Sequence, residues 1–178
     1  MRKSAFQAAA ALALVASAQA QAAQTQQAET CLTRPELRGM IAYFMPTVLQ
    51  SAIDTCSPQL KPDSFLLGRA PKLVGSLEAG RAEAWPMAKQ AITKIGNSRT
   101  KGSGDMLANL PEEAVGPMIN AVIAQELSSE IKPESCGDIN RVMTPLEPLP
   151  AANMIDLITE ALALAGRSDK KMRLCVES

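Results

Sequence analysis

The chain of 178 residues contains no histidine. Histidine is the general base of the Ser-His-Asp and Cys-His hydrolases and a usual ligand of zinc and haem iron, so its absence excludes those classes. Aromatic residues make up only 3% of the chain. With so few aromatic rings and no basic stripe, the protein is poorly equipped to bind nucleic acid. We therefore expect no nucleic-acid partner, no metal and no cofactor.

Three further absences narrow the fold class. The chain has no Cys-x-x-Cys pair, which removes support for thioredoxin-like redox chemistry or c-type haem attachment. Beyond the N-terminus, no apolar run approaches the roughly 20 residues of a transmembrane helix. No segment alternates apolar and polar residues with the period of two that indicates a β-strand. These absences favour a soluble helical protein.

The first 22 residues have the organisation of a secretory signal peptide. Two basic residues precede an apolar run over residues 8–16, and small residues alternate with glutamine after it. The run is too short for a permanent membrane anchor, and the small residues predict cleavage after Ala20 or Ala22. We therefore expect a periplasmic or secreted protein.

Cleavage also sets the composition of the mature chain. The full chain has 18 Lys and Arg residues against 18 Asp and Glu residues, and loss of Arg2 and Lys3 leaves an excess of two acidic residues. Residues 23–30 are rich in Gln, Ala and Thr without apolar periodicity, which is typical of a disordered tether. Residues 31–178 then form the expected single helical domain.

Four cysteines remain after cleavage, namely Cys31, Cys56, Cys136 and Cys175. An even number of cysteines in an oxidising compartment predicts two disulfides. Three pairings are open, and we favour pairing of neighbours, Cys31 with Cys56 and Cys136 with Cys175.

The favoured pairing depends on Pro46. Residues 33–55 have a helical pattern, and one straight helix of that length would span about 35 Å, whereas bridged Cα atoms lie within about 7 Å. Cys31 can reach Cys56 only if the chain reverses, and Pro46 is the one candidate for that reversal. If Pro46 only kinks a continuous helix, the pairing is wrong.

Apolar residues recur at helical spacing in most of the chain. Thr33, with Glu36 three residues later, has the pattern of a capping box and begins the first helix. The clearest helix covers residues 111–131, and its apolar positions include Met118 and Val122. Two further helices are expected over 138–143 and 151–165. We predict an all-α fold, a compact bundle of about five to seven helices stapled by two disulfides.

Several segments resemble functional sites, but each has a structural interpretation that we favour. Residues 96–104 combine glycines, hydroxyls and two cations, as in a phosphate-binding loop, yet they lack the Walker spacing and suit a flexible connection. The eight methionines after the signal segment could line an adaptable groove, but most have core spacing. Trp85 suits a core anchor, with Arg81 placed to contact its ring. The proline-rich residues 145–150 suit a stiff connector.

Three functions remain open. The first is a non-enzymatic module that binds another protein at the cell envelope, favoured by the export signal, the cysteines and the lack of catalytic motifs. The second is a periplasmic carrier of a lipid or other apolar small molecule, favoured by the helix faces rich in Met, Leu and Ile. The third is a histidine-independent carboxylate hydrolase using Asp156 and Glu160, which lie one helical turn apart.

Overall fold

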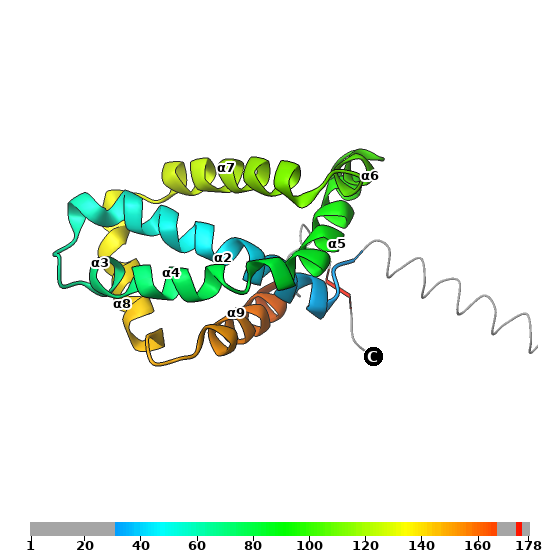
Figure 1. Ribbon diagram of the computed structural model, residues 1–178. Helices are drawn as coiled ribbons and strands as arrows, with labels where there is room; N and C mark the ends of the chain where they lie inside the picture. The colour runs from blue at the N-terminus through cyan, green and yellow to red at the C-terminus, as the bar shows by residue number, and fades with distance from the viewer. Residues whose placement is uncertain (1–30, 167–173, 176–178) are drawn as a thin grey trace, which may run out of the picture.

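The computed structural model describes residues 31–166 and 174–175, and this part of the chain is built from helices (Figure 1). The predicted all-α fold with two disulfides is confirmed. The described residues form eight α-helices and three short 3-10 helices. In chain order these are α2 (Arg34–Cys56), η1 (Ser57–Gln59), α3 (Phe65–Gly68), α4 (Ala70–Glu78), α5 (Arg81–Arg99), α6 (Ser103–Ala108), α7 (Glu112–Glu130), η2 (Pro133–Ser135), α8 (Cys136–Met143), η3 (Thr144–Leu146) and α9 (Ala151–Gly166). The predicted signal peptide and tether lie outside the described residues.

Helix α2 is the centre of the fold. It contacts α4, α5, α7 and α9, and Figure 1 shows α7 along one side of the molecule and α9 along the other. Leu37, Ile41 and Leu49 of α2 form the main core cluster with Leu77 of α4 and Ile155 of α9. Helices α4, α5, α7 and α9 are therefore arranged around α2, whereas α6 packs on α5 and α8 packs on α3.

The start of α2 follows directly from its sequence. The Thr33 hydroxyl accepts a hydrogen bond from the Glu36 amide at 3.4 Å, and the Glu36 carboxylate accepts one from the Thr33 amide at 2.8 Å. This reciprocal pair is the predicted capping box. The helix then continues through Pro46, whose side chain is fully buried. Pro46 removes one helical hydrogen bond, but packing on several sides of α2 keeps the chain helical there.

The favoured disulfide pairing is wrong. Because α2 is continuous through Pro46, Cys31 and Cys56 lie at opposite ends of a helix of 23 residues, about 35 Å long. Cys31 is bonded to Cys175 and Cys56 to Cys136, with Cα–Cα distances of 5.1 and 5.4 Å. The first disulfide joins the two ends of the described chain, and the second joins the C-terminal end of α2 to α8.

The predicted loop over residues 96–104 is also wrong over most of its length. Helix α5 continues to Arg99 and α6 begins at Ser103, leaving a short turn in which Gly102 has φ of 83°. A Cβ on Gly104 would overlap the Thr93 carbonyl, and a Cβ on Gly96 would lie 2.8 Å from the Gly104 Cα. These two glycines therefore allow close packing of α5 on α6.

The helices predicted in the C-terminal half are confirmed as α7, α8 and α9, with ends that differ by a residue or two. The proline-rich connector contains η3 and a turn before α9. Within the described residues, no single helix is long and apolar enough to cross a membrane. One pair, Pro133–Leu146 with Ala151–Gly166, meets the length and composition test together, but is bent by 120°.

Candidate functional site

Asp156 and Glu160, the predicted carboxylate pair, are engaged in ion pairs that join α9 to α2. The Asp156 carboxylate lies 2.6 Å from Nε of Arg38, and the Glu160 carboxylate pairs with Arg34. Both acidic side chains are more than half exposed, where ion pairs contribute at most about 1 kcal/mol. Each carboxylate therefore faces a cation, and this arrangement adds nothing in favour of acid–base catalysis.

Arg81 contacts the ring of Tyr43. The sequence had suggested a contact with the ring of Trp85 instead. Its guanidinium carbon lies 5.2 Å from the Tyr43 ring centroid, and its Nε donates to the Tyr43 carbonyl at 3.1 Å. Trp85 also packs against Tyr43, with ring centroids of Trp85 and Tyr43 4.9 Å apart. Trp85 is therefore a half-buried side chain packed against the core around Tyr43.

Tyr43 is a buried tyrosine that the sequence did not single out. Its side chain is 2% exposed, and a Cβ on Gly116 of α7 would overlap its hydroxyl. Burial, reinforced by the nearby Glu112 carboxylate, raises the pKa of Tyr43 to about 12. The neutral phenol is therefore strongly preferred in the folded protein.

Titration of Tyr43 should differ between the folded and unfolded protein. The chain has one tyrosine, so tyrosinate absorbance reports this residue alone. We expect a midpoint near 12 when folded and near 10 in denaturant. Because the unfolded state loses its proton first, the free energy of unfolding should fall by about 2 kcal/mol as the pH rises from 10 to 12. A folded-state midpoint near 10 would show that Tyr43 is accessible to water.

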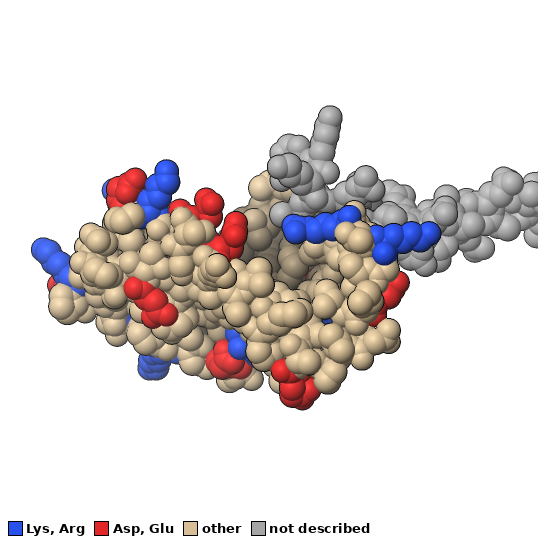
Figure 2. Space-filling model, turned by 90° about the horizontal axis from the view of Figure 1, so that it is seen from above, with Lys and Arg blue, Asp and Glu red and all other residues tan. Residues whose placement is uncertain are grey.

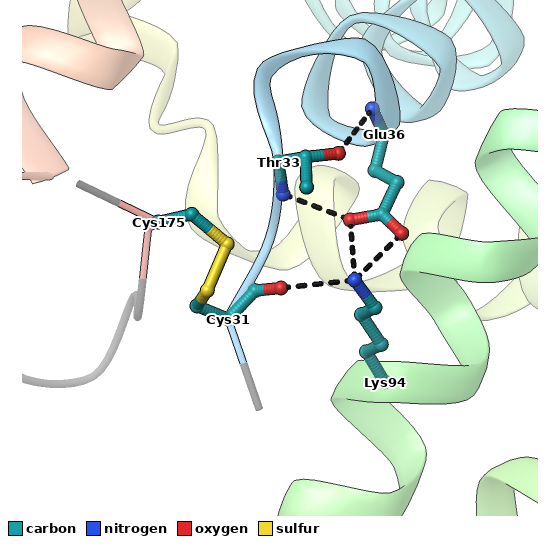
Figure 3. The surroundings of a disulfide bond; sticks show 5 residues. All are labelled: Cys31, Thr33, Glu36, Lys94 and Cys175. Carbon is teal, nitrogen blue, oxygen red and sulfur yellow. Dashed lines mark hydrogen bonds and ion pairs between the residues drawn. A yellow bond between two sulfur atoms is a disulfide. The ribbon is translucent and has the colours of Figure 1, made fainter. Parts of the chain in front are cut away.

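The buried carboxylate of Glu36 holds the start of α2 beside the Cys31–Cys175 disulfide (Figure 3). The Lys94 ammonium of α5 lies 2.7 Å from the Glu36 carboxylate and donates to the Cys31 carbonyl at 3.1 Å. Burial pushes the pKa of Glu36 upward, but hydrogen bonds from Lys94 and Thr33 outweigh it, and the pKa is lowered. Because the Glu36 carboxylate is engaged by Lys94 and Thr33, this group stabilises the fold.

The outward side of α7 is an uncharged surface, which we call the α7 outer face. Its members are exposed and share one side of the helix; they are Ala114, Met118, Ala121, Val122, Gln125 and Ser129. Met118 is 48% and Val122 62% exposed. Figure 2, viewed from the side on which α7 lies in Figure 1, shows a mostly uncharged surface with a few acidic side chains within it.

A pocket opens on another part of the molecule, between α2, α4, α5 and α9. It has a volume of about 610 Å³, within the range of small-molecule sites. Its walls are mostly small or aliphatic side chains, and Arg38 and Glu83 supply its charges. Sequence patterns could not indicate it, because its lining comes from helices far apart in the chain.

The methionines divide between buried and exposed positions. Met154 and Met45 are buried, as core packing expects, whereas Met106 and Met118 are exposed large side chains. Among the described residues, no three His, Cys, Asp or Glu side chains are grouped so that they could hold a metal ion.

Comparison of the chain with protein-family models, curated proteins and solved structures finds no match. The described part of the chain is all-α and carries two disulfides. Disulfides are consistent with an oxidising environment. The α7 outer face and the pocket are the two surfaces of the described residues that could bind another molecule.

Proposed function

We propose that this protein is an exported, non-enzymatic module of the cell envelope that binds a partner protein through the α7 outer face. Export is supported by the signal-peptide pattern of residues 1–22 and by two disulfides, which form in periplasmic and secreted proteins. The binding role is supported by the surface of α7.

The observation that carries the proposal is the exposure of Met118 and Val122 on one uncharged helix face. The opposite side of α7 packs against the rest of the protein, since Val115 is buried and Gly116 lies against the Tyr43 hydroxyl. The apolar residues on the outer face therefore have no role in the core of the described protein. Apolar patches of this kind mark interaction surfaces.

Charge around the face indicates the chemistry of the partner. Helix α7 contains four glutamates, among them Glu113 near its start and Glu126 and Glu130 near its end, and no Lys or Arg. A second copy of α7 would place glutamate near glutamate in either orientation. A helix with an apolar face flanked by Lys or Arg would complement the surface in both shape and charge. The proposed partner is therefore a basic amphipathic helix.

Binding of defined peptides tests the proposal. A synthetic amphipathic helix of leucine and lysine should bind the oxidised protein, whereas the same helix with glutamate in place of lysine should not. Val122→Lys removes apolar contact and adds a repelling charge, so it should weaken binding of the basic peptide at least about tenfold. Fluorescence anisotropy of labelled peptide measures both effects.

Val142→Lys is the matched control, because Val142 of α8 is 63% exposed, much like Val122. It should leave the affinity unchanged. Equal loss of binding in both variants, or equal binding of the basic and acidic peptides, would contradict docking on the α7 outer face.

Carriage of a lipid or other apolar small molecule is the second candidate function. The observation in its favour is the pocket between α2, α4, α5 and α9. Native mass spectrometry of the protein purified from its own compartment should then show a bound mass that denaturation removes. Recovery of the bare polypeptide mass alone would count against this candidate.

A further inference from the structure

The pocket between α2, α4, α5 and α9 has an apolar floor. Ala42, Leu77 and Ile155, which come from three different helices, are all buried there. Ala152 of α9 also lines the pocket but is exposed, which places it toward the mouth. A ligand can therefore bury an apolar body against the floor and keep a polar group near solvent.

The two charged side chains that line the pocket are not equally available. Arg38 is already paired, because its Nε donates to the Asp156 carboxylate at 2.6 Å. Glu83 is exposed at the pocket, and it has no hydrogen bond or ion pair to any side chain within the described part of the protein. Arg38, Asp156 and Glu83 together carry one excess negative charge, and that charge is on Glu83.

We infer that the pocket binds an organic cation, an amine attached to a short apolar body, with Glu83 as the counter-ion. A carboxylate ligand would share Arg38 with Asp156 and would add negative charge near Glu83. A neutral ligand of the same shape would gain only the apolar contacts. A cation keeps the Arg38–Asp156 pair intact and neutralises Glu83. Its charge is therefore complementary to that of the pocket.

Glu83 also lies in the first turn of α5, where an acidic residue complements the helix dipole. Replacing Glu83 therefore affects stability slightly whatever the pocket binds. Ligand affinity, and not stability, is the quantity that tests its role in the pocket.

Three ligands with the same eight-carbon chain form the test: octylamine, octanoate and octanol. Each is added to the oxidised protein below the concentration at which it forms micelles or a separate phase. Isothermal titration calorimetry should show octylamine binding about two- to fivefold more tightly than octanol, and octanoate more weakly than either. Glu83→Gln should reduce the affinity for octylamine to that for octanol. Glu113→Gln removes an exposed glutamate from α7 and should leave all three affinities unchanged.

Ala152→Phe supplies a second variant that does not disturb the core, since it places a ring at the mouth of the pocket. It should abolish binding of all three ligands, whereas Ala161→Phe, at an exposed position of α9 away from the pocket, should not. Octanoate binding as tightly as octylamine, or octylamine binding unchanged in Ala152→Phe, would overturn the inference, as would no binding of octylamine. Val122→Lys should leave octylamine binding intact, so failure of docking on α7 and failure of this inference are distinguishable.

Discussion

Replacing Cys56 and Cys136 together with alanine should lower the free energy of unfolding by about 4–5 kcal/mol. The disulfide closes a loop with a sequence separation of 80, and a cross-link of that length removes this much chain entropy from the unfolded state. Both cysteines are buried, at 0% and 1% exposure, within a core cluster that includes Phe65 and Leu66. Urea denaturation of the double variant beside the parent protein measures the change.

The same prediction tests the pairing itself. Peptide mapping of the unreduced parent should find Cys56 joined to Cys136 and Cys31 joined to Cys175. A fragment joining Cys31 to Cys56, or a double variant with the unfolding midpoint of the parent, would contradict the arrangement described here.

Gly39→Ala should destabilise the protein by about 3 kcal/mol, although alanine is the better helix former. Gly39 lies where α2 crosses α5, and a Cβ there would overlap the Met87 Cβ and lie 3.1 Å from the Ala88 amide nitrogen. Because these atoms belong to the backbone of α5 or are fixed to it, α2 and α5 would have to move apart. Thermal and urea unfolding both report the loss.

Gly75→Ala is the control for this substitution. Gly75 lies in α4 with no atom within 4 Å of an added Cβ, so alanine should stabilise the protein by about 0.5–1 kcal/mol through helix propensity. If Gly39→Ala stabilises the protein as Gly75→Ala does, α2 and α5 are not in close contact at this point.

Local signals predicted the helices well. The capping box of Thr33 and Glu36 fixed the start of α2, and apolar spacing located α7 and α9. Such signals act within a few residues and are independent of the rest of the fold. The disulfide pairing instead depended on whether Pro46 ends α2, which is decided by the packing around that proline and not by its sequence neighbours.

The candidate sites were less predictable than the helices. In α7, Met118 and Val122 are apolar like the buried Val115. Apolar periodicity therefore could not show that Met118 and Val122 face solvent while Val115 faces the core. Glycines at 96 and 104 looked like loop residues because close helix contact and turn formation both use glycine. The pocket depends on four helices, and its charge depends on the pairing of Arg38 with Asp156.

Hydrogen exchange tests the proposed docking surface most directly. The oxidised protein would be compared with and without the basic leucine–lysine peptide, with exchange followed by mass spectrometry across the chain. Docking on the α7 outer face predicts slower exchange over Glu112–Glu130 and little change in α8 or α9. Protection centred on the pocket helices, or no protection of α7 at saturating peptide, would contradict the proposal.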